Sequence, residues 1–205
     1  MPMCGRYYLK SEDMNTVITS LLRSLESKSG DGVKTGGEIY PGDTAPVLAP
    51  NRAGLCRAFF MDWGYPLHSK RIINARSETA AQKPLFRDGM RSRRCIIPAS
   101  CYYEWGKIDH QKYDFHPEAG KGLLLAGIYR PEPDGRYSYT VLTRDAAPHL
   151  VHLHPRMPLI LPADAVTAWL TPGFDPDAVI RNARTDIAFA PAPLPLDKTA
   201  SDTVY

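Results

Sequence analysis

Hydrophobic positions near the start of the chain recur at the spacing of an amphipathic helix. The apolar side chains between residues 11 and 27 are Met14, Val17, Ile18, Leu21, Leu22 and Leu25. Steps of three and four residues place them on one helical face. Ser11 is the expected N-cap, and the polar, glycine-containing run 29–32 is expected to end the helix.

From residue 45 onward the pattern changes to short β-branched or aromatic runs that proline and glycine separate. Such runs predict strands, which we place at residues 47–49, 56–63, 95–97 and 101–105. Two further strands, 122–129 and 137–143, are joined by a Pro-Glu-Pro-Asp-Gly turn and predict a hairpin.

Short helices are expected between these strands and after them. They are placed within residues 77–91, at 163–170 and at 175–183. Pro176 suits the first position of the last of these helices, because that position has no hydrogen bond to lose. The tail around Pro191, Pro193 and Pro195 is expected to be extended.

The chain has 205 residues and a mass of 22.8 kDa, which suits one domain with its own core. Proline accounts for 19 of the 205 residues, a share well above the average of roughly 5%. This high proline content favours short elements over long helices. No linker or repeat divides the chain. We therefore expect a single α+β domain over residues 1–205, with an antiparallel or mixed sheet that curls toward a barrel and short flanking helices.

Composition narrows the possible partners. The formal net charge is only +3, which disfavours a general polyanion binder. The four cysteines form no C-x-x-C pair, so neither a zinc ribbon nor a thioredoxin motif is predicted. No apolar run approaches the roughly 20 residues of a membrane span. We therefore expect a cytoplasmic protein with no membrane segment.

Glu104 is the clearest candidate for chemistry. In the strand 101–105, alternation places Tyr102 and Glu104 on one face and Tyr103 and Trp105 on the other. If that face is enclosed, the pKa of the carboxyl rises and Glu104 becomes a candidate general acid or base. The alternative is a solvent-facing glutamate beside aromatic residues.

Asn74 and Arg76 lie two residues apart at a predicted strand-to-helix junction. Free backbone N–H groups and an arginine fork at such a junction suit an anion such as phosphate. The alternative is a capping loop with a structural arginine.

Three histidines crowd into residues 149–154. In a strand, His152 and His154 share a face and mimic a zinc pair, but no acidic or cysteine partner is near them in the sequence. A single histidine with a perturbed pKa, next to Arg156, is therefore the preferred interpretation.

Cys4 is notable for its position near the N-terminus. An N-terminal cysteine carries a thiol and an α-amine of pKa roughly 7.7–8.0. The amine can form a Schiff base with an aldehyde, and the sulfur can then close a thiazolidine ring. The alternative is an inert thiol near the start of the chain.

Basic residues gather between positions 70 and 94. They include Lys70, Arg71, Arg76, Arg87, Arg91, Arg93 and Arg94. With Trp63, Tyr65 and Phe86 nearby, they suggest a groove in which bases of a single strand stack on aromatic rings. The alternative is a solvated helix face.

Six short motifs together resemble the SRAP (SOS response-associated peptidase) family, in order and over most of the chain. They are Met3-Cys4-Gly5-Arg6-Tyr7, Trp63-Gly64, Asn74-Ala75-Arg76-Ser77-Glu78-Thr79, Arg94-Cys95-Ile96-Ile97-Pro98-Ala99, Tyr102-Tyr103-Glu104-Trp105 and His154-Pro155-Arg156-Met157-Pro158. The ordered set is far more specific than any one motif.

The resemblance implies a protein that shields abasic sites in single-stranded DNA by a covalent crosslink through an N-terminal cysteine. Cys4 then attacks the ring-opened sugar aldehyde, Asn74 and Glu104 polarise or protonate the reacting oxygen, and His154 moves protons. A peptidase-like or lyase-like activity belongs to the family description. The expected DNA contacts are Arg6, Trp63, Arg76, Arg87 and Arg156. The resemblance implies no metal and no organic cofactor. We expect a monomer that is nucleoid-associated when bound to DNA.

The chain departs from the family pattern at its start. Met1-Pro2 precedes Met3, so a chain that starts at Met1 leaves Cys4 internal. We expect Met3 to be the native start, or further trimming to expose Cys4. Two other functions stay open: a cysteine hydrolase or self-processing peptidase that uses Cys4, His154 and Glu104 or Asn74, and a non-covalent single-strand binder.

Overall fold

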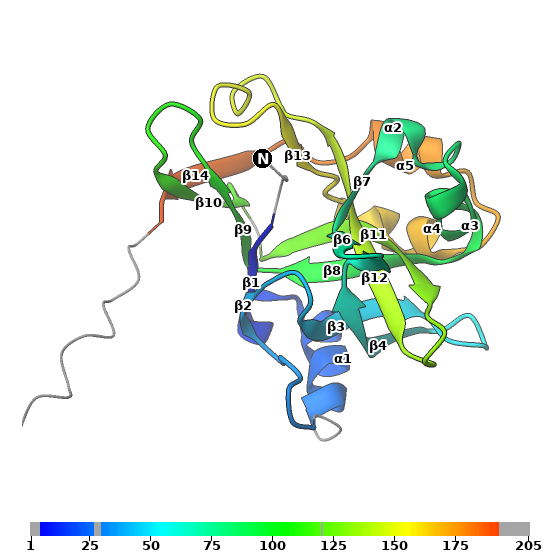
Figure 1. Ribbon diagram of the computed structural model, residues 1–205. Helices are drawn as coiled ribbons and strands as arrows, with labels where there is room; N and C mark the ends of the chain where they lie inside the picture. The colour runs from blue at the N-terminus through cyan, green and yellow to red at the C-terminus, as the bar shows by residue number, and fades with distance from the viewer. Residues whose placement is uncertain (1–4, 27–29, 120, 193–205) are drawn as a thin grey trace, which may run out of the picture.

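A five-stranded antiparallel sheet forms one side of the protein in the computed structural model, which describes residues 5–26, 30–119 and 121–192 (Figure 1). Its strands, in spatial order, are β14 (Ile187–Pro191), β10 (Lys112–Pro117), β9 (Cys101–Trp105), β1 (Tyr7–Leu9) and β2 (Gly37–Ile39). The central pair, β9 and β1, places the first described residues of the chain beside the Glu104 strand.

A second sheet closes on itself. Its strands are β11 (Leu123–Pro131), β8 (Arg94–Ala99), β3 (Thr44–Pro50), β4 (Cys56–Trp63), β12 (Tyr137–Asp145) and β13 (Arg156–Pro158), with β7 (Asn74–Arg76) beside β12. Because β11 also pairs with β12, the strands form a closed circuit. The pairings of β12 with β4 and β7 are parallel. The prediction of a curled, mixed sheet in an α+β fold is confirmed.

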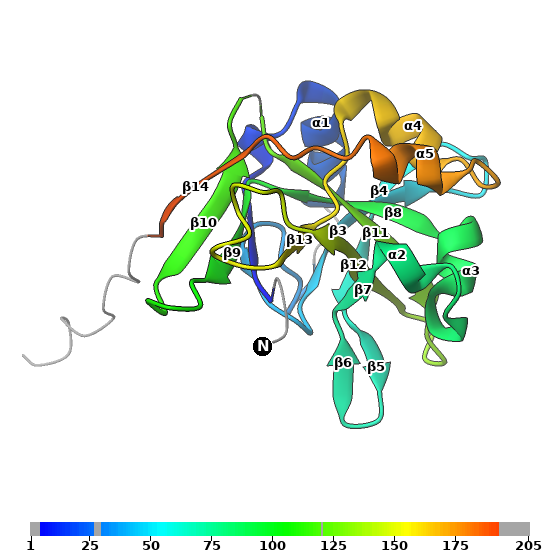
Figure 2. The same ribbon diagram turned by 90° about the horizontal axis from the view of Figure 1, so that it is seen from above.

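A small ribbon, β5 (Tyr65–Leu67) and β6 (Lys70–Ile72), projects from the body between β4 and β7 (Figure 2). The helices are short and lie outside the barrel. They are α1 (Thr16–Glu26), α2 (Ser77–Ala80), α3 (Pro84–Ser92), α4 (Val166–Leu170) and α5 (Pro176–Arg181), with 3₁₀ turns η1 (Ser11–Asp13) and η2 (Ala163–Ala165). Within the described residues, no helix has the length and apolar character needed to cross a bilayer.

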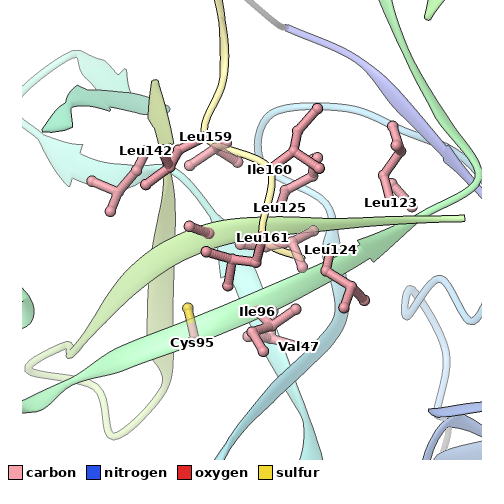
Figure 3. Close-up of a cluster of buried hydrophobic side chains, with 14 of the residues drawn as sticks. Val47, Cys95, Ile96, Leu123, Leu124, Leu125, Leu142, Leu159, Ile160 and Leu161 are labelled. Atoms are coloured by element: carbon pink, nitrogen blue, oxygen red, sulfur yellow. The ribbon is translucent and has the colours of Figure 1, made fainter. Parts of the chain in front are cut away.

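Aliphatic side chains of the barrel strands and of the segment after β13 form a shared core. All six residues of β8 are buried, and so are the first six of β11, as strands covered on both faces require. Val47, Ile96, Leu125 and Leu142 meet Leu159–Leu161 in this cluster (Figure 3). This core fixes β12, and with it the strands β7 and β13 on its edge.

The strands expected from the sequence are all present. The predicted strands 56–63 and 101–105 match β4 and β9, and the predicted hairpin is formed by β11 and β12. Helix α5 begins at Pro176, as expected, and the Asp175 side chain accepts a hydrogen bond from the Asp177 N–H. Strands β10 and β14 were not predicted. The tail was expected to be extended around its prolines. Pro191 is the last residue of β14, whereas Pro193 and Pro195 lie outside the described residues.

Two expectations about helices were wrong in detail. The first helix begins at Thr16, because Met14 is extended and the Asn15 side chain caps the Ile18 N–H at 3.0 Å. Ser11 instead starts a 3₁₀ turn. The helix expected within 77–91 is divided into α2 and α3 because Lys83 is extended before Pro84, as steric contact with a proline ring favours.

Arg94 is a buried cation that ties β8 to the helical side of the protein. Its side chain is 3% exposed and donates to the carbonyl oxygens of Trp169, Met90 and Thr171, each at 2.6 Å, and to that of Phe174 at 3.1 Å. Four carbonyl groups at the ends of helices therefore depend on one guanidinium group.

Replacing Arg94 by methionine is expected to lower the free energy of unfolding by about 2–4 kcal/mol, because buried carbonyl groups lose their donor. Urea denaturation followed by tryptophan fluorescence measures this change. Arg87→Met is the matched control, since that side chain is 64% exposed on α3 and its loss is expected to change the free energy by less than about 0.5 kcal/mol. Equal effects of the two substitutions would contradict the structural role of Arg94.

Candidate active site

A cleft of about 910 Å³ lies where the two sheets meet. Its lining residues come from the segment before β1, from β7, from β9 and the following loop, from β12 and from the segment that leads into β13. They are Gly5, Arg6, Asn74, Arg76, Glu104, Trp105, Lys107, Thr143, His154, Pro155 and Arg156. Asn74, Glu104 and His154, three of the four predicted catalytic residues, thus line one cleft. Cys4 lies outside the described residues, but Gly5, which follows it, lines the same cleft.

Glu104 owes its place to the alternation of β9. Tyr102 and Glu104 are buried, with Glu104 only 5% exposed, whereas Tyr103 and Trp105 are half-buried on the other face. The predicted division of the strand between two faces is confirmed. Glu104 is both buried and part of the cleft lining, and a carboxyl group in such a place is a candidate acid or base.

Asn74 and Arg76 occupy the ends of β7, with buried Ala75 between them. Parallel pairing with β12 sets Arg76 opposite Thr143, and both residues line the cleft. Helix α2 begins directly after Arg76, so the predicted strand-to-helix junction is confirmed. Arg76 is exposed and forms no ion pair with a described residue, and its guanidinium therefore presents a charge at the mouth of the cleft.

His154 ends an irregular segment that joins β12 to β13. Its Nδ1 lies 3.0 Å from the carbonyl oxygen of Arg156, and the Arg156 N–H lies 3.2 Å from the same nitrogen. Burial lowers the pKa of the ring below its usual value, because it disfavours the charged form. The imidazole is therefore neutral at pH 7 and able to accept a proton.

The alternative in which His152 and His154 share a strand face is not formed. Residues 148–153 form turns, because the Ala146 N–H bonds to the Pro155 carbonyl oxygen at 3.0 Å and closes the segment into a loop. His152 packs against Phe189, and His149 bonds to the Ile187 carbonyl oxygen. Among the described residues, no three metal-ligating side chains lie together.

Arg6 is held between two aromatic rings at the edge of the cleft. Its guanidinium carbon lies 4.4 Å from the ring centre of Tyr40 and 5.2 Å from that of Trp105, and Glu38 forms an ion pair with it at 3.4 Å. Stacking and the ion pair restrict the side chain, so Arg6 offers a charge in a fixed place.

Trp63 is buried, whereas the prediction of a DNA contact requires an exposed side chain. Its side chain is 0% exposed and packs between Tyr7 and Tyr139. The following Gly64 has a φ of +98°, and a Cβ there would lie 2.9 Å from Ile73. The Trp63-Gly64 motif therefore has a structural role in the barrel, because Trp63 packs in its core and only glycine fits the turn that follows.

The predicted basic groove is also not formed as a unit. Arg94 is buried, and Arg71 and Arg93 donate to the carbonyl oxygens of Gly64 and Tyr129. Arg87 lies on α3 beside Asp88 and does not line the cleft. The cationic residues that line the cleft are instead Arg6, Arg76, Lys107 and Arg156. Lys107 was not singled out from the sequence, and its position directly after the Glu104 strand was the available signal.

Comparison with known proteins agrees with this architecture. The family model described as SOS response associated peptidase (SRAP) matches residues 3–190, which include every residue that lines the cleft. The chain belongs to the SRAP family.

A curated relative from Bacillus subtilis (strain 168), named abasic site processing protein YoqW, is 32% identical over 200 residues, covering 85% of this chain and 84% of its own length. The abasic site processing protein HMCES of Xenopus tropicalis is 31% identical over 150 residues, covering 60% of this chain and 45% of its own length.

Solved structures share the fold. A protein from Bacteroides thetaiotaomicron superposes with a TM-score of 0.71 at 17% identity, covering 91% of this chain and 90% of that one. A phage-related protein from Bordetella bronchiseptica gives a TM-score of 0.71 at 22% identity, covering 93% and 95% of the two chains.

Proposed function

We propose that this protein processes abasic sites in single-stranded DNA, and that it does so by forming a covalent crosslink through Cys4 as the N-terminal residue. The observation that carries the proposal is the cleft that Gly5, Asn74, Glu104 and His154 line together. Its relatives YoqW and HMCES are named abasic site processing proteins, which supports the same substrate.

The proposed reaction needs no cofactor. The α-amine of Cys4 adds to the aldehyde of the ring-opened sugar, and the carbinolamine loses water to give a Schiff base. The thiolate then adds to the imine carbon, the nitrogen takes up a proton, and a thiazolidine ring closes. One aldehyde, one amine and one thiol give the ring and one water molecule, without oxidation or reduction.

Three cleft residues supply the proton transfers in this proposal. Glu104 protonates the sugar or carbinolamine oxygen that leaves, which is work for a buried carboxyl group. Asn74, which lines the same cleft, polarises the same oxygen in this proposal. His154, neutral because burial lowers its pKa, accepts the proton that the thiol or amine releases.

Arg76 and Lys107 are the proposed contacts for phosphates on either side of the lesion, since both line the cleft. Arg6, fixed between two rings, adds a third charge two residues after Cys4 in the sequence. An abasic strand suits such a site because it has no stacked base to extrude. The protein acts as a monomer in this proposal. Three localised charges are enough to position the DNA, because the covalent bond then keeps the protein attached to it.

The test uses protein that begins at Cys4 and an oligonucleotide that carries one abasic site. An adduct that survives a denaturing gel, absent with the intact oligonucleotide, is the expected result. Retention in a native gel without a denaturation-resistant adduct would replace the proposal with a non-covalent binder. Turnover of an amide substrate without an adduct would favour the cysteine hydrolase, an activity that the family description also suggests.

A further inference from the structure

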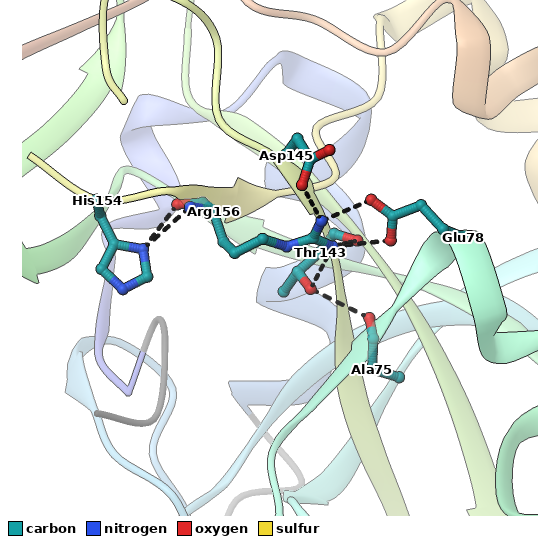
Figure 4. A network of polar contacts seen from close by, with 6 residues as sticks. All are labelled: Ala75, Glu78, Thr143, Asp145, His154 and Arg156. Carbon is teal, nitrogen blue, oxygen red and sulfur yellow. Dashed lines mark hydrogen bonds and ion pairs between the residues drawn. The ribbon is translucent and has the colours of Figure 1, made fainter. Parts of the chain in front are cut away.

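The guanidinium of Arg156 is bonded on three sides at one wall of the cleft (Figure 4). Its Nη1 and Nη2 lie 2.6 and 2.8 Å from the two carboxylate oxygens of Glu78. Nη1 also lies 2.5 Å from Asp145, and Nη2 donates to the Thr143 carbonyl oxygen at 2.9 Å. Two parallel bonds to one carboxylate fix the arginine in direction as well as in place.

The two carboxylates differ in how far water screens them. The Arg156 side chain is only 14% exposed, whereas Glu78 is 44% and Asp145 85% exposed. An ion pair with a largely solvated partner contributes little to stability. Of the two ion pairs, the one with Glu78 therefore restrains the Arg156 side chain more than the one with Asp145. The hydrogen bond from Arg156 lowers the pKa of the Glu78 carboxyl, which keeps the carboxyl ionised at neutral pH.

This ion pair joins two segments of the site that share no backbone hydrogen bonds with each other. Glu78 stands in α2, two residues after Arg76, and Arg156 begins β13, two residues after His154. Strand β12 lies between them, pairing with β7 on one side and β13 on the other. The Arg156 side chain therefore spans β12 and connects the Asn74 side of the cleft to the His154 side.

The placement of His154 depends on the backbone of Arg156. The segment 146–155 lies outside the sheets and is anchored by buried Leu150 and Leu153. Within the described residues, the hydrogen bonds of the His154 ring both go to the backbone of Arg156. When Nδ1–H donates to the Arg156 carbonyl oxygen, the lone pair is on Nε2, which bonds to no described residue. The orientation of the His154 ring, and therefore the direction in which Nε2 points, depends on the backbone of Arg156.

We propose that Glu78 is a positioning residue of the cleft, which acts through the guanidinium of Arg156 to hold His154 in its half-buried orientation. In this structure the Arg156 guanidinium is bonded to two carboxylates, so a phosphate that contacted it would compete with them. The link to DNA rests on the proposed function, whereas the link between Glu78 and His154 does not.

The test is the titration of the His154 ring by NMR in the DNA-free protein, with His154→Gln used to assign its signals. Glu78→Gln keeps the size of the side chain and removes its charge. The expected result is a His154 pKa that moves up toward the ordinary value of about 6.5, because the released ring gains water. Asp145→Asn is the matched control and is expected to move the His154 pKa less.

The reaction gives a second measurement. Glu78→Gln is expected to slow adduct formation about 10- to 100-fold, as misplaced catalytic groups do, while affinity for an intact single strand changes less than about twofold. Glu78→Asp, which keeps the charge, is expected to recover part of the rate. A slowing that equals the loss of affinity would overturn the proposal.

An unchanged His154 titration in folded Glu78→Gln overturns the proposal whatever the crosslinking assay gives. If wild-type protein forms no adduct, the proposed function fails, and the titration still decides the role of Glu78. If Glu78→Gln does not fold, Arg156→Lys replaces it, because lysine keeps the charge and loses the fork. The same rise in the His154 pKa is expected, and its absence overturns the proposal.

Discussion

Protein that begins at Cys4 is expected to crosslink to an abasic oligonucleotide, and protein that begins at Met1 or Pro2 is expected to form no detectable crosslink. An internal Cys4 has an amide nitrogen in place of the amine, so it cannot form the Schiff base that precedes ring closure. Intact mass of each preparation establishes the first residue, and a denaturing gel measures the adduct.

Two variants separate the roles of amine and thiol. Cys4→Ala at the N-terminus keeps the amine, so its adduct is expected only after borohydride reduction of the Schiff base. Cys101→Ser is the control at another cysteine, since burial raises the pKa of that thiol to about 11 and leaves little thiolate. A stable adduct from protein that retains Met1 would assign the nucleophile to another residue.

Glu104→Gln is expected to slow crosslinking by about 100-fold or more, because the amide cannot donate the proton that the leaving oxygen needs. Single-turnover rates on gels measure the slowing, and fluorescence anisotropy with an intact strand measures binding. Affinity is expected to change little, since Glu104 carries no charge complementary to phosphate.

Glu118→Gln is the matched control for this substitution. Glu118 is exposed beyond the end of β10 and does not line the cleft, so its crosslinking rate is expected to equal that of the wild type. Parallel losses of rate and affinity in Glu104→Gln would argue that the carboxyl group supports the shape of the cleft and takes no part in proton transfer.

The sequence was most informative where structure follows from neighbouring residues. The alternation over 101–105 predicted which face Glu104 occupies, because side chains of a strand alternate whatever the strand pairs with. The short spacing of Asn74 and Arg76 before a helix predicted a junction in the same way. Both features depend on a few residues and on backbone geometry alone.

Features that depend on distant contacts were not predicted. Trp63 is covered by Tyr7 and Tyr139, which lie far from it in the sequence, so its burial has no local signal. Nothing in the sequence around Arg94 distinguishes it from a surface arginine. Its burial depends on the carbonyl groups of α4 and of the following turn, which bind its guanidinium in the folded protein. Strand β10 differs from these two cases, because its alternation of polar and aromatic residues is the local pattern of a strand with one covered face.

The spread of the cleft along the chain has a consequence for synthesis on the ribosome. The cleft draws on residues from Gly5 to Arg156, and β12 must pair with β4, β7 and β13 before its walls meet. A nascent chain therefore exposes Cys4 long before it possesses the strand that bears Glu104 or the segment that bears His154. In the proposed chemistry, a newly made chain can capture aldehydes without the groups that direct the reaction, until residue 156 has emerged and the barrel has closed.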